Sequence, residues 1–291
     1  MKTALEITAT QSPGRIGTWS ECQQKWSYIY RDGLRSPPGI ALVYGRAWDK
    51  FISDPDSSFW HEKLKSGRSL SISQAQDLFV SHWDECQKEW EEWGEIKPDE
   101  LQKMGVKATE VWVPDFGEVY DPIIIQKHWQ LGIEDGEDHF SINGVIDTVL
   151  QHRDEDEAVL HDDKTSAASW VTKTGANAGR PNRKALGSLQ APAYLIAAEH
   201  EEELKGKART DKFIWDIQVK TKTPYFQQVE VEVDQAQKDS YLLMAKHSRR
   251  EQIAAINADW FFPNRQSNLC SKRFCGYWQK CQETHGGQIL D

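Results

Sequence analysis

Apolar residues in the first third of the chain recur every three or four positions, which is the spacing of helices with one buried face. Such faces run through residues 16–30 and 40–52. A third face begins at Ser73, whose hydroxyl we expect to form a capping box with Gln76, and it extends to Trp93. The pattern therefore predicts a helical N-terminal third.

From Val111 onward, short apolar runs replace the helical period and predict strands. The expected strands lie at residues 123–125, 129–133, 140–150, 158–160, 213–220 and 225–233. Two helices are expected among them, at residues 185–200 and 235–258. The residues between 166 and 184 are rich in Gly, Asn and basic side chains, which predicts a loop.

Composition narrows the class of protein. The chain has 291 residues, 38% of them hydrophobic, and 13 Trp, which excludes a disordered protein. No apolar run approaches the length of a membrane span, and the N-terminus lacks the apolar core of a signal peptide, so an intracellular protein is expected. The net charge of −10 argues against a surface that coats nucleic acid, but not against one local binding groove.

Two acidic motifs close short apolar runs in the middle of the chain. The first is Gly144-Val145-Ile146-Asp147, and the second is Asp162-Asp163-Lys164-Thr165. The polar residues 151–157 between them predict a hairpin turn, so two adjacent strands would bring Asp147, Asp162 and Lys164 to one end of a sheet. Paired carboxylates suit a hard divalent cation, and a nearby lysine can steady a phosphate. The set suits metal-assisted phosphodiester hydrolysis.

Cysteine is used in an uneven way. Five Cys in an intracellular chain do not indicate a disulfide framework. Cys86 falls on the apolar helical face, which predicts a core residue. Cys270, Cys275 and Cys281 instead crowd a polar tail, which favours a ligand role for these three thiols.

The ordered set of motifs resembles that of RecB-like nucleases of the PD-(D/E)XK superfamily. Gly45 with Asp49 precedes the two acidic motifs, and Gln190 with Tyr194 follows them one helical turn apart. The resemblance spans the chain from about Ser12 to Cys281.

The resemblance implies an α/β fold, with a restriction-endonuclease-like core in which helices flank a central mixed sheet. It implies one nuclease domain over residues 1–291 and a helical insertion over 51–110 that narrows the path to the site.

The resemblance also implies roles for the acidic motifs. Asp147 and Asp162 would bind Mg²⁺ or Mn²⁺, and the backbone carbonyl of Asp163 would be a further ligand. Lys164 would align or deprotonate the attacking water and offset negative charge on the phosphorane.

Gln190 and Tyr194 would hydrogen-bond Lys164 or the DNA backbone. Asp49 stands where many RecB-like nucleases have His, so it is either a further oxygen ligand or a helix-surface charge. Gln126 stands where a glutamate is often found, which removes one negative charge near the site.

The cysteines extend the resemblance. Cys22 with Cys270, Cys275 and Cys281 is similar to the iron–sulfur staple of AddB-type, CRISPR-adaptation and phage exonucleases, although four residues rather than two separate the first C-terminal pair. The implied group is a 4Fe–4S cluster in a tail over residues 264–285 joined to Cys22. Thiolate chemistry alone leaves zinc as an alternative.

The function implied is that of a metal-dependent DNA exonuclease acting on single strands or duplex ends, in recombination, repair or phage DNA processing. The expected location is the cytoplasm of a bacterial or phage-infected cell, with a protein partner or homo-oligomer left open. The substitutions at Asp49 and Gln126 motivate an alternative, a non-catalytic iron–sulfur DNA-binding or adaptor subunit. An RNA nuclease or a deaminase-like zinc enzyme is less favoured, since the His/Cys spacing of zinc deaminases is missing.

Overall fold

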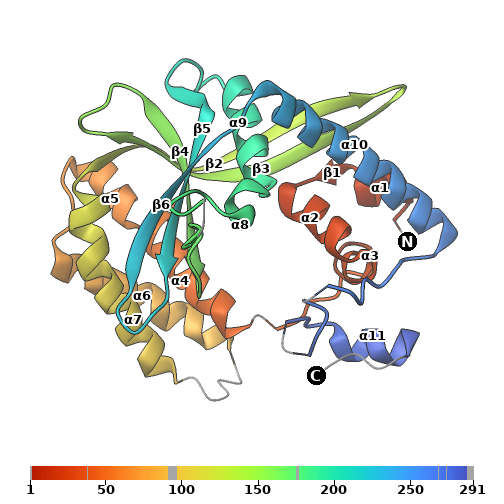
Figure 1. The fold of residues 1–291 in the computed structure, drawn as a ribbon, viewed down its shortest axis with the longest axis horizontal. Helices are drawn as coiled ribbons and strands as arrows, with labels where there is room; N and C mark the ends of the chain where they lie inside the picture. Colours follow the sequence, from red (N-terminus) through yellow and green to blue (C-terminus); the bar gives the residue numbers. More distant parts are fainter. Residues whose placement is uncertain are drawn as a thin grey trace. The chain divides into compact units, whose positions relative to one another are not determined.

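The fold is that of a computed structural model, which describes residues 2–37, 39–90, 97–174, 177–267, 269–272 and 274–286. The chain forms two compact units, shown in Figure 1. The terminal unit consists of Met1–Pro37, Gln130–Gly144 and Gln235–Asp291. The central unit consists of Pro38–Trp129 and Val145–Asp234. The prediction of one nuclease domain over the whole chain stays a prediction.

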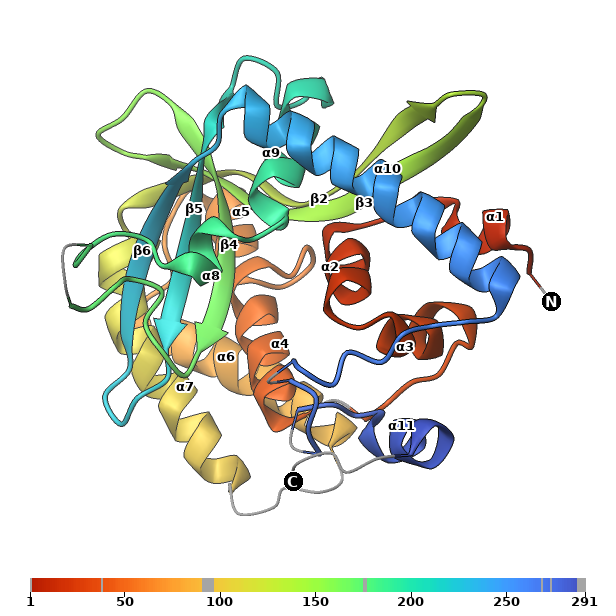
Figure 2. The ribbon, with the colours of Figure 1, turned by 45° about the vertical axis from the view of Figure 1, so that its right-hand side comes forward.

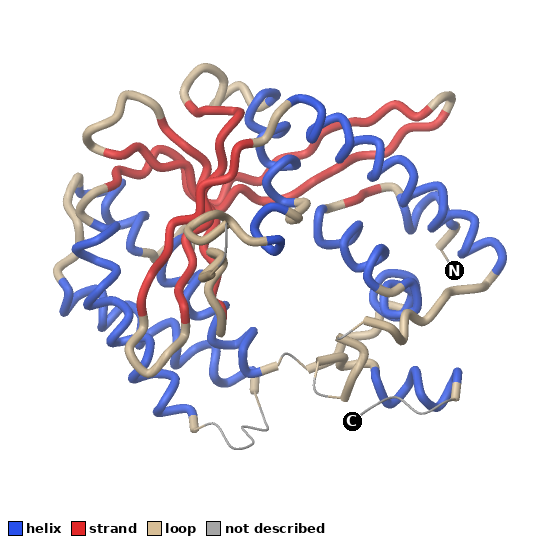
Figure 3. The backbone as a smooth tube through the Cα atoms, in the orientation of Figure 1, coloured by secondary structure: helices blue, strands red, loops and turns tan. Residues whose placement is uncertain are grey.

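A mixed sheet organises the central unit. Its strands run in the order β3 (Asp138–His152), β4 (Ala158–Ser166), β5 (Ala208–Val219) and β6 (Tyr225–Glu232), shown as red tubes in Figure 3. The β3–β4 and β5–β6 pairs are antiparallel, whereas β4 and β5 are parallel. A parallel pair needs a crossover connection, and helix α9 (Gln190–His200) lies in that connection.

Helices cover this sheet, as expected for the α/β class. Helix α9 packs against β5, and α4 (Ile40–Ser53) packs against β4 (Figure 2). The predicted helix over 185–200 is in fact two pieces, because α8 (Arg183–Leu186) ends at Gly187 before α9 begins.

Strand β2 (Tyr120–Asp135) corrects one prediction. It pairs with β3 and contains both apolar runs that the sequence suggested were separate strands. Gln126 lies between the two runs with φ of +50°, in the left-handed region that non-glycine residues seldom adopt. This local twist interrupts the alternation of buried and exposed positions, so the sequence of this single strand resembles that of two separate strands.

The predicted helical insertion is a bundle of helices with an aromatic core. The helices after α4 are α5 (Phe59–Ser66), α6 (Ile72–Cys86) and α7 (Pro98–Trp112), and a π-helical turn η3 (Val113–Gly117) ends the bundle. Their shared core is built from large aromatic side chains, which include Trp48, Phe51, Phe59, Phe79, Trp83 and Trp112. Cys86 is 2% exposed in this core, which confirms its predicted place.

The start of α6 differs from the prediction. Ser71, not Ser73, caps the helix, and the side chain of Gln74 answers it in the capping box. The Ser-x-x-Gln spacing occurs twice in succession here, so the sequence alone could not select the cap. Trp93, expected on the same helical face, lies outside the described residues.

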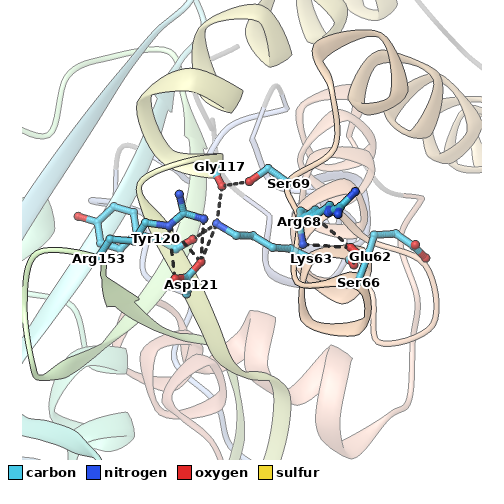
Figure 4. Close-up of polar contacts among 9 residues, drawn as sticks. All are labelled: Glu62, Lys63, Ser66, Arg68, Ser69, Gly117, Tyr120, Asp121 and Arg153. Carbon is cyan, nitrogen blue, oxygen red and sulfur yellow. Dashed lines mark hydrogen bonds and ion pairs between the residues drawn. The ribbon is translucent and has the colours of Figure 1, made fainter.

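A buried lysine fixes the bundle to the first residues of β2 (Figure 4). Lys63 on α5 is 2% exposed, and its ammonium donates to the backbone carbonyls of Gly117 and Tyr120. It also forms an ion pair with Asp121 at 2.9 Å, and Arg153 approaches the same carboxylate at 3.3 Å. A buried ammonium is tolerated only when its donors are satisfied in this way.

The terminal unit is mainly helical. Its elements are α1 (Ala4–Thr8), β1 (Thr10–Gln11), α2 (Pro13–Glu21), α3 (Gln23–Trp26), the π-helical turn η1 (Ser27–Arg31), α10 (Gln235–Ala258) and α11 (Trp278–His285). The long α10 has the predicted bounds and packs against α1 and α2. Strand β1 also contacts α10, because the buried side-chain amides of Gln11 and Gln252 hydrogen-bond each other.

The single helix expected over residues 16–30 is wrong. Cys22 adopts extended backbone angles, φ −162° and ψ 109°, and divides it into α2 and α3. Ile16, Trp19 and Trp26 are nevertheless all buried, because both pieces turn their apolar sides inward. Within the described residues, no helix has the length and apolarity needed to cross a membrane.

Candidate functional site

The two acidic motifs lie on neighbouring strands, as their spacing predicts. Thr148 of β3 is paired with His161 of β4, so Asp147 and Asp162 occupy the next positions of the two antiparallel strands. Asp162 is 0% exposed, whereas Asp147 is half-buried. The hairpin therefore brings the two carboxylates together from positions fifteen residues apart.

Lys164 belongs to the same face of β4 as Asp162, because alternate residues of a strand share a face. Its Nζ donates to Oδ1 of Asp162 and lies 3.5 Å from the backbone carbonyl oxygen of Asp163. That carbonyl is the one expected to be a metal ligand. The ammonium is thus held between a carboxylate and a carbonyl.

Helix α9 supplies the remaining contact to Asp162. Gln190, the first residue of the helix, donates from Nε2 to Oδ2 of Asp162 at 3.1 Å and lies 3.1 Å from the hydroxyl of Tyr194. The resemblance implies a hydrogen bond from Gln190 to Lys164 or to the DNA backbone. In the structure, its amide instead contacts the carboxylate of Asp162. Both oxygens of Asp162 therefore have fixed hydrogen-bond donors.

The electrostatics of this cluster are those of crowded carboxylates. Burial, followed by repulsion from Asp162, raises the pKa of Asp147 well above its usual value. Burial also raises the pKa of Asp162, against the opposing effect of Lys164. Burial alone would lower the pKa of Lys164, but attraction to Asp162 and Asp147 outweighs it and the pKa rises. The lysine is the positive charge that the carboxylates require.

Asp49 approaches the same cluster from α4. A Cβ on Gly45 would lie 3.4 Å from the Oγ1 of Thr165, which is an ordinary van der Waals contact, so this helix passes close to the end of β4. Asp49, one turn later, is half-buried. Burial raises its pKa, the charge of Lys164 lowers it, and that of Asp162 raises it. Asp49 is therefore part of the electrostatic cluster and not an isolated surface charge.

Two further side chains hold Asp49 in place. The Ser53 hydroxyl lies 3.4 Å from Oδ1 of Asp49, and Gln126 donates from Nε2 to that hydroxyl at 2.8 Å. The unusual backbone of Gln126 on β2 directs its amide to this contact. Sequence reasoning missed Ser53, although its position four residues after Asp49 on a helix was the available signal.

A second polar network was also missed. His161 Nδ1 and Asp216 Oδ2 lie 2.7 Å apart, Gln228 donates to the other oxygen of Asp216 at 2.9 Å, and Tyr120 donates to Gln228 at 3.0 Å. His161 and Asp216 are both buried. The network ties β4, β5 and β6 to Tyr120, the first residue of β2, and His161 is the residue directly before Asp162 in the chain. A buried acid in the apolar β5 was its only signal in the sequence.

The donor set fits a hard divalent cation. Asp49, Asp147 and Asp162 offer carboxylate oxygens, and their raised pKa values reflect an excess of negative charge that a cation would offset. In the part of the chain that the structure describes, no three His, Cys, Asp or Glu side chains already stand in a metal-holding arrangement. Lys164 and Gln190 both donate hydrogen bonds to Asp162, and they would have to share its carboxylate with the cation.

The four cysteines of the predicted staple come together in the terminal unit. Cys22, Cys270, Cys275 and Cys281 line one pocket, together with apolar and polar residues of the tail. All four are free thiols. Burial, followed by the charges of Cys22 and Cys270, raises the pKa of Cys281 to about 11. The same two kinds of cause, burial first, raise the pKa of Cys270.

This convergence fits a thiolate-bound group. Four thiols around one pocket are the donor set of a 4Fe–4S cluster or a structural zinc, although the described residues do not form a closed ligand set as they stand. The extended backbone at Cys22 is part of this arrangement, since it lies between α2 and α3 and not on a helix face. Two polar residues of the same tail, Asn268 and Arg273, lie outside the described residues.

Known proteins resemble this chain in sequence pattern and in fold. A sequence model described as the PD-(D/E)XK nuclease superfamily matches residues 10–282. Among solved structures, the chain is similar to a presumed exonuclease from Eubacterium rectale, with a TM-score of 0.52 and 11% identity over 92% of this chain and 89% of that chain. At this identity the likeness shows the fold alone.

One further solved structure is less similar to this chain. The solved structure of SSO0001 has a TM-score of 0.31 and 14% identity over 67% of this chain and 84% of that chain, which is too low to carry an argument. No curated protein matches the sequence.

Proposed function

Because the chain belongs to the PD-(D/E)XK nuclease superfamily, we propose that it is a metal-dependent deoxyribonuclease that works as an exonuclease on single strands or duplex ends. The observation that carries the proposal is the cluster of Asp147, Asp162 and Lys164 at one place on the β3–β4 hairpin. Carboxylates beside a lysine are the groups that phosphodiester hydrolysis with a divalent cation requires.

The metal in this proposal is Mg²⁺ or Mn²⁺. Asp147, Asp162 and the carbonyl of Asp163 would hold it, with Asp49 as a further oxygen ligand. When bound, such a cation polarises the phosphoryl oxygen and lowers the pKa of a coordinated water. The excess of negative charge in the cluster supports this assignment.

The chain's own residues would act through position and charge. The Lys164 ammonium would orient the attacking water and offset the charge that develops on the phosphorane. Gln190 would keep the Asp162 carboxylate in one orientation from its place on α9. Tyr194, which contacts the same amide, would limit how that amide can turn.

Two observations support exonuclease action. It rests on the fold shared with the presumed exonuclease from Eubacterium rectale and on the net charge of −10, which would repel DNA from most of the surface. A strand end admitted to one local site meets less repulsion than a long duplex laid across the surface.

We propose further that Cys22, Cys270, Cys275 and Cys281 hold a 4Fe–4S cluster, with zinc as the alternative. Their convergence on one pocket supports a shared ligand for the four thiols. Iron, acid-labile sulfide and zinc content, measured together with the visible absorbance of protein purified without oxygen, would separate the two. Protein that holds neither iron nor zinc would contradict this part of the proposal.

The nuclease proposal is tested with end-labelled single-stranded and duplex DNA, incubated with Mg²⁺, Mn²⁺ or EDTA. Cleavage is expected with either metal and not in EDTA, and circular DNA should resist if the enzyme needs an end. The matched variant is Asp162→Asn, which keeps the shape of the side chain and should lose cleavage. Equal cleavage by this variant would contradict the assignment.

A DNA-binding adaptor subunit remains the second candidate. The observation that favours it is that Lys164 and Gln190 already bond both oxygens of Asp162, the carboxylate that would have to bind the cation. The same assay decides between the two, because an adaptor would bind the labelled DNA and release no product with any metal.

A further inference from the structure

Three lysines gather where strands β4 and β5 end, and only Lys164 has a role in the proposed chemistry. Lys220 follows the last residue of β5, and its backbone N–H donates to the carbonyl of Ser166, the last residue of β4, at 2.8 Å. Lys184 lies on the short helix α8, in the loop region that follows β4. The fold thus places three ammonium groups near the ends of strands β4 and β5.

Aromatic rings hold these lysines in position. The ammonium of Lys184 lies 4.3 Å from the ring centre of Trp170, whose ring lies 5.3 Å from that of Trp215. The ammonium of Lys164 lies 5.6 Å from the ring centre of Trp215. Trp170 is only 5% exposed, so it supports a lysine and offers no open face for stacking a base. Cation–π contacts of this kind restrict the movement of an ammonium without neutralising it.

Lys220 has a support of the same type. Its ammonium lies 5.3 Å from the ring centre of Tyr44. Tyr44 is fully buried on α4, and its hydroxyl accepts a hydrogen bond from Gln218 at 2.7 Å. The ring is therefore a fixed surface, and Lys220, whose ammonium lies above it, is half-buried.

Neither Lys184 nor Lys220 has an acidic partner in an ion pair among the residues that the structure describes. Burial and then repulsion by Lys164 lower the pKa of Lys184. Burial and then repulsion by Lys184 lower the pKa of Lys220. Like charges held close together without counter-charges destabilise each other unless an anion binds between them.

We propose that Lys184 and Lys220 form a phosphate-binding platform for the DNA strand, which holds backbone phosphates next to the phosphate that lies beside Lys164. The proposal deepens the proposed nuclease function and rests on it for the identity of the strand. Contacts to phosphates fix the position of a strand without reading its bases, so the platform should bind strands of any sequence. It would also keep the strand in place between successive cleavage steps.

The test separates binding from cleavage. Fluorescence anisotropy measures the binding of a labelled oligothymidine in EDTA, over a series of salt concentrations, to wild-type protein and to the double variant Lys184→Gln/Lys220→Gln. Loss of two phosphate contacts should lower the slope of log affinity against log salt by about 1.4 for a single strand. The double arginine variant keeps both charges and should keep the slope.

Two controls guard against misfolding and general charge effects. Lys205→Gln removes one positive charge from a lysine that already pairs with Glu202 at 3.4 Å, and it should leave the slope unchanged. The melting temperature of each variant reports its folding. A folded double variant with the wild-type slope would overturn the platform, whatever the protein cleaves.

Cleavage of the same oligothymidine with Mn²⁺ completes the design. If the wild-type protein binds through Lys184 and Lys220 but yields no product, the nuclease proposal fails and the platform stands. If it cleaves and the slope is unaffected by the double variant, the platform fails and the nuclease proposal stands. With both correct, the double variant should raise KM more than it lowers kcat.

Discussion

The carboxylate cluster of the central unit and the cysteine pocket of the terminal unit gather reactive side chains in different ways. In the central unit, strands and helices carry the side chains, and hydrogen bonds from Lys164 and Gln190 fix both oxygens of Asp162. In the terminal unit, Cys22 lies at a break between two helices, Cys270 and Cys275 lie in the irregular tail, and Cys281 lies on the short helix α11. The four thiols share a pocket.

The difference indicates what each set needs from a bound ion. A carboxylate already oriented by a sheet and a helix can take up and release a cation while the fold stays intact. Thiols carried mostly by irregular segments or by a short helix gain their order from the ion itself, so that binding contributes to folding. We therefore expect the central site to be a site of exchange and the cysteine pocket to be structural.

Replacing one thiol should break the comparison most severely. Cys281→Ser should lose the bound iron or zinc and lower the free energy of unfolding by several kcal/mol, because metal binding there is folding free energy. Metal analysis and thermal unfolding measure both effects. Cys86→Ser is the matched control, since Cys86 is buried outside the pocket and its loss should leave the metal content unchanged. Full metal content in Cys281→Ser would contradict the structural role.

The buried Lys63 of the central unit sharpens the contrast between structural and reactive charge. Lys63→Met should lower the free energy of unfolding by about 3 kcal/mol, because the carbonyls of Gly117 and Tyr120 and the carboxylate of Asp121 lose their shared donor. Urea titration measures this loss. Cleavage by the folded fraction should stay near the wild-type rate. A Lys63→Met variant that is as stable as the wild type but inactive would contradict the structural role of Lys63.

The contact from Gln126 through Ser53 to Asp49 tests how far preorganisation extends in the central site. Gln126→Ala should lower cleavage at limiting Mn²⁺ about tenfold, since an oriented carboxylate near the metal loses its support. Ser53→Ala should have a similar effect, and the double variant should be little worse than either, because the three side chains act in series. Ser66→Ala, which removes a serine bonded within its own helix region, is the control. Additive losses would contradict a serial contact.

The smallest expected effect concerns the stability of the metal-free protein. The pKa of Asp147 is raised in the folded state, so between its ordinary value of 3.8 and the raised value the folded protein binds more protons than the unfolded one. Stability must then fall as pH rises through that window. Asp147→Asn should flatten this dependence and stabilise the protein in EDTA at pH 7 by about 1 kcal/mol. Added Mn²⁺ should reverse the order by stabilising only the wild type, and a less stable variant in EDTA would argue against crowded carboxylates.

Local patterns in the sequence were sufficient where one periodicity governs a whole element. The uninterrupted helical pattern of residues 235–258 gave α10 with its observed bounds. The two acidic motifs could be assigned to neighbouring strands because a polar turn separates two short apolar runs. Where a single residue changes the backbone, as Cys22 and Gln126 do, the pattern alone predicted the wrong division into elements.

The parts of the site that the sequence did not reveal depend on register between distant strands. His161 meets Asp216 because β4 and β5 pair in parallel across a long connection, and no local signal specifies that register. Lys220 comes near the end of β4 for the same reason, whereas Lys184 is brought there by the short helix α8. Their individual positions resemble ordinary surface lysines, and only the tertiary fold reveals that they lie together.

We propose that Lys164 and the carboxylates beside it form a metal-dependent catalytic site in the central unit. The most direct measurement is single-turnover cleavage of a labelled DNA strand by Lys164→Met, at Mn²⁺ concentrations shown by calorimetry to saturate that variant. We expect Mn²⁺ binding to be retained and the rate to be lowered by at least about a hundredfold, since one charge that stabilises the transition state is lost. A variant that binds Mn²⁺ and cleaves at the wild-type rate would contradict it.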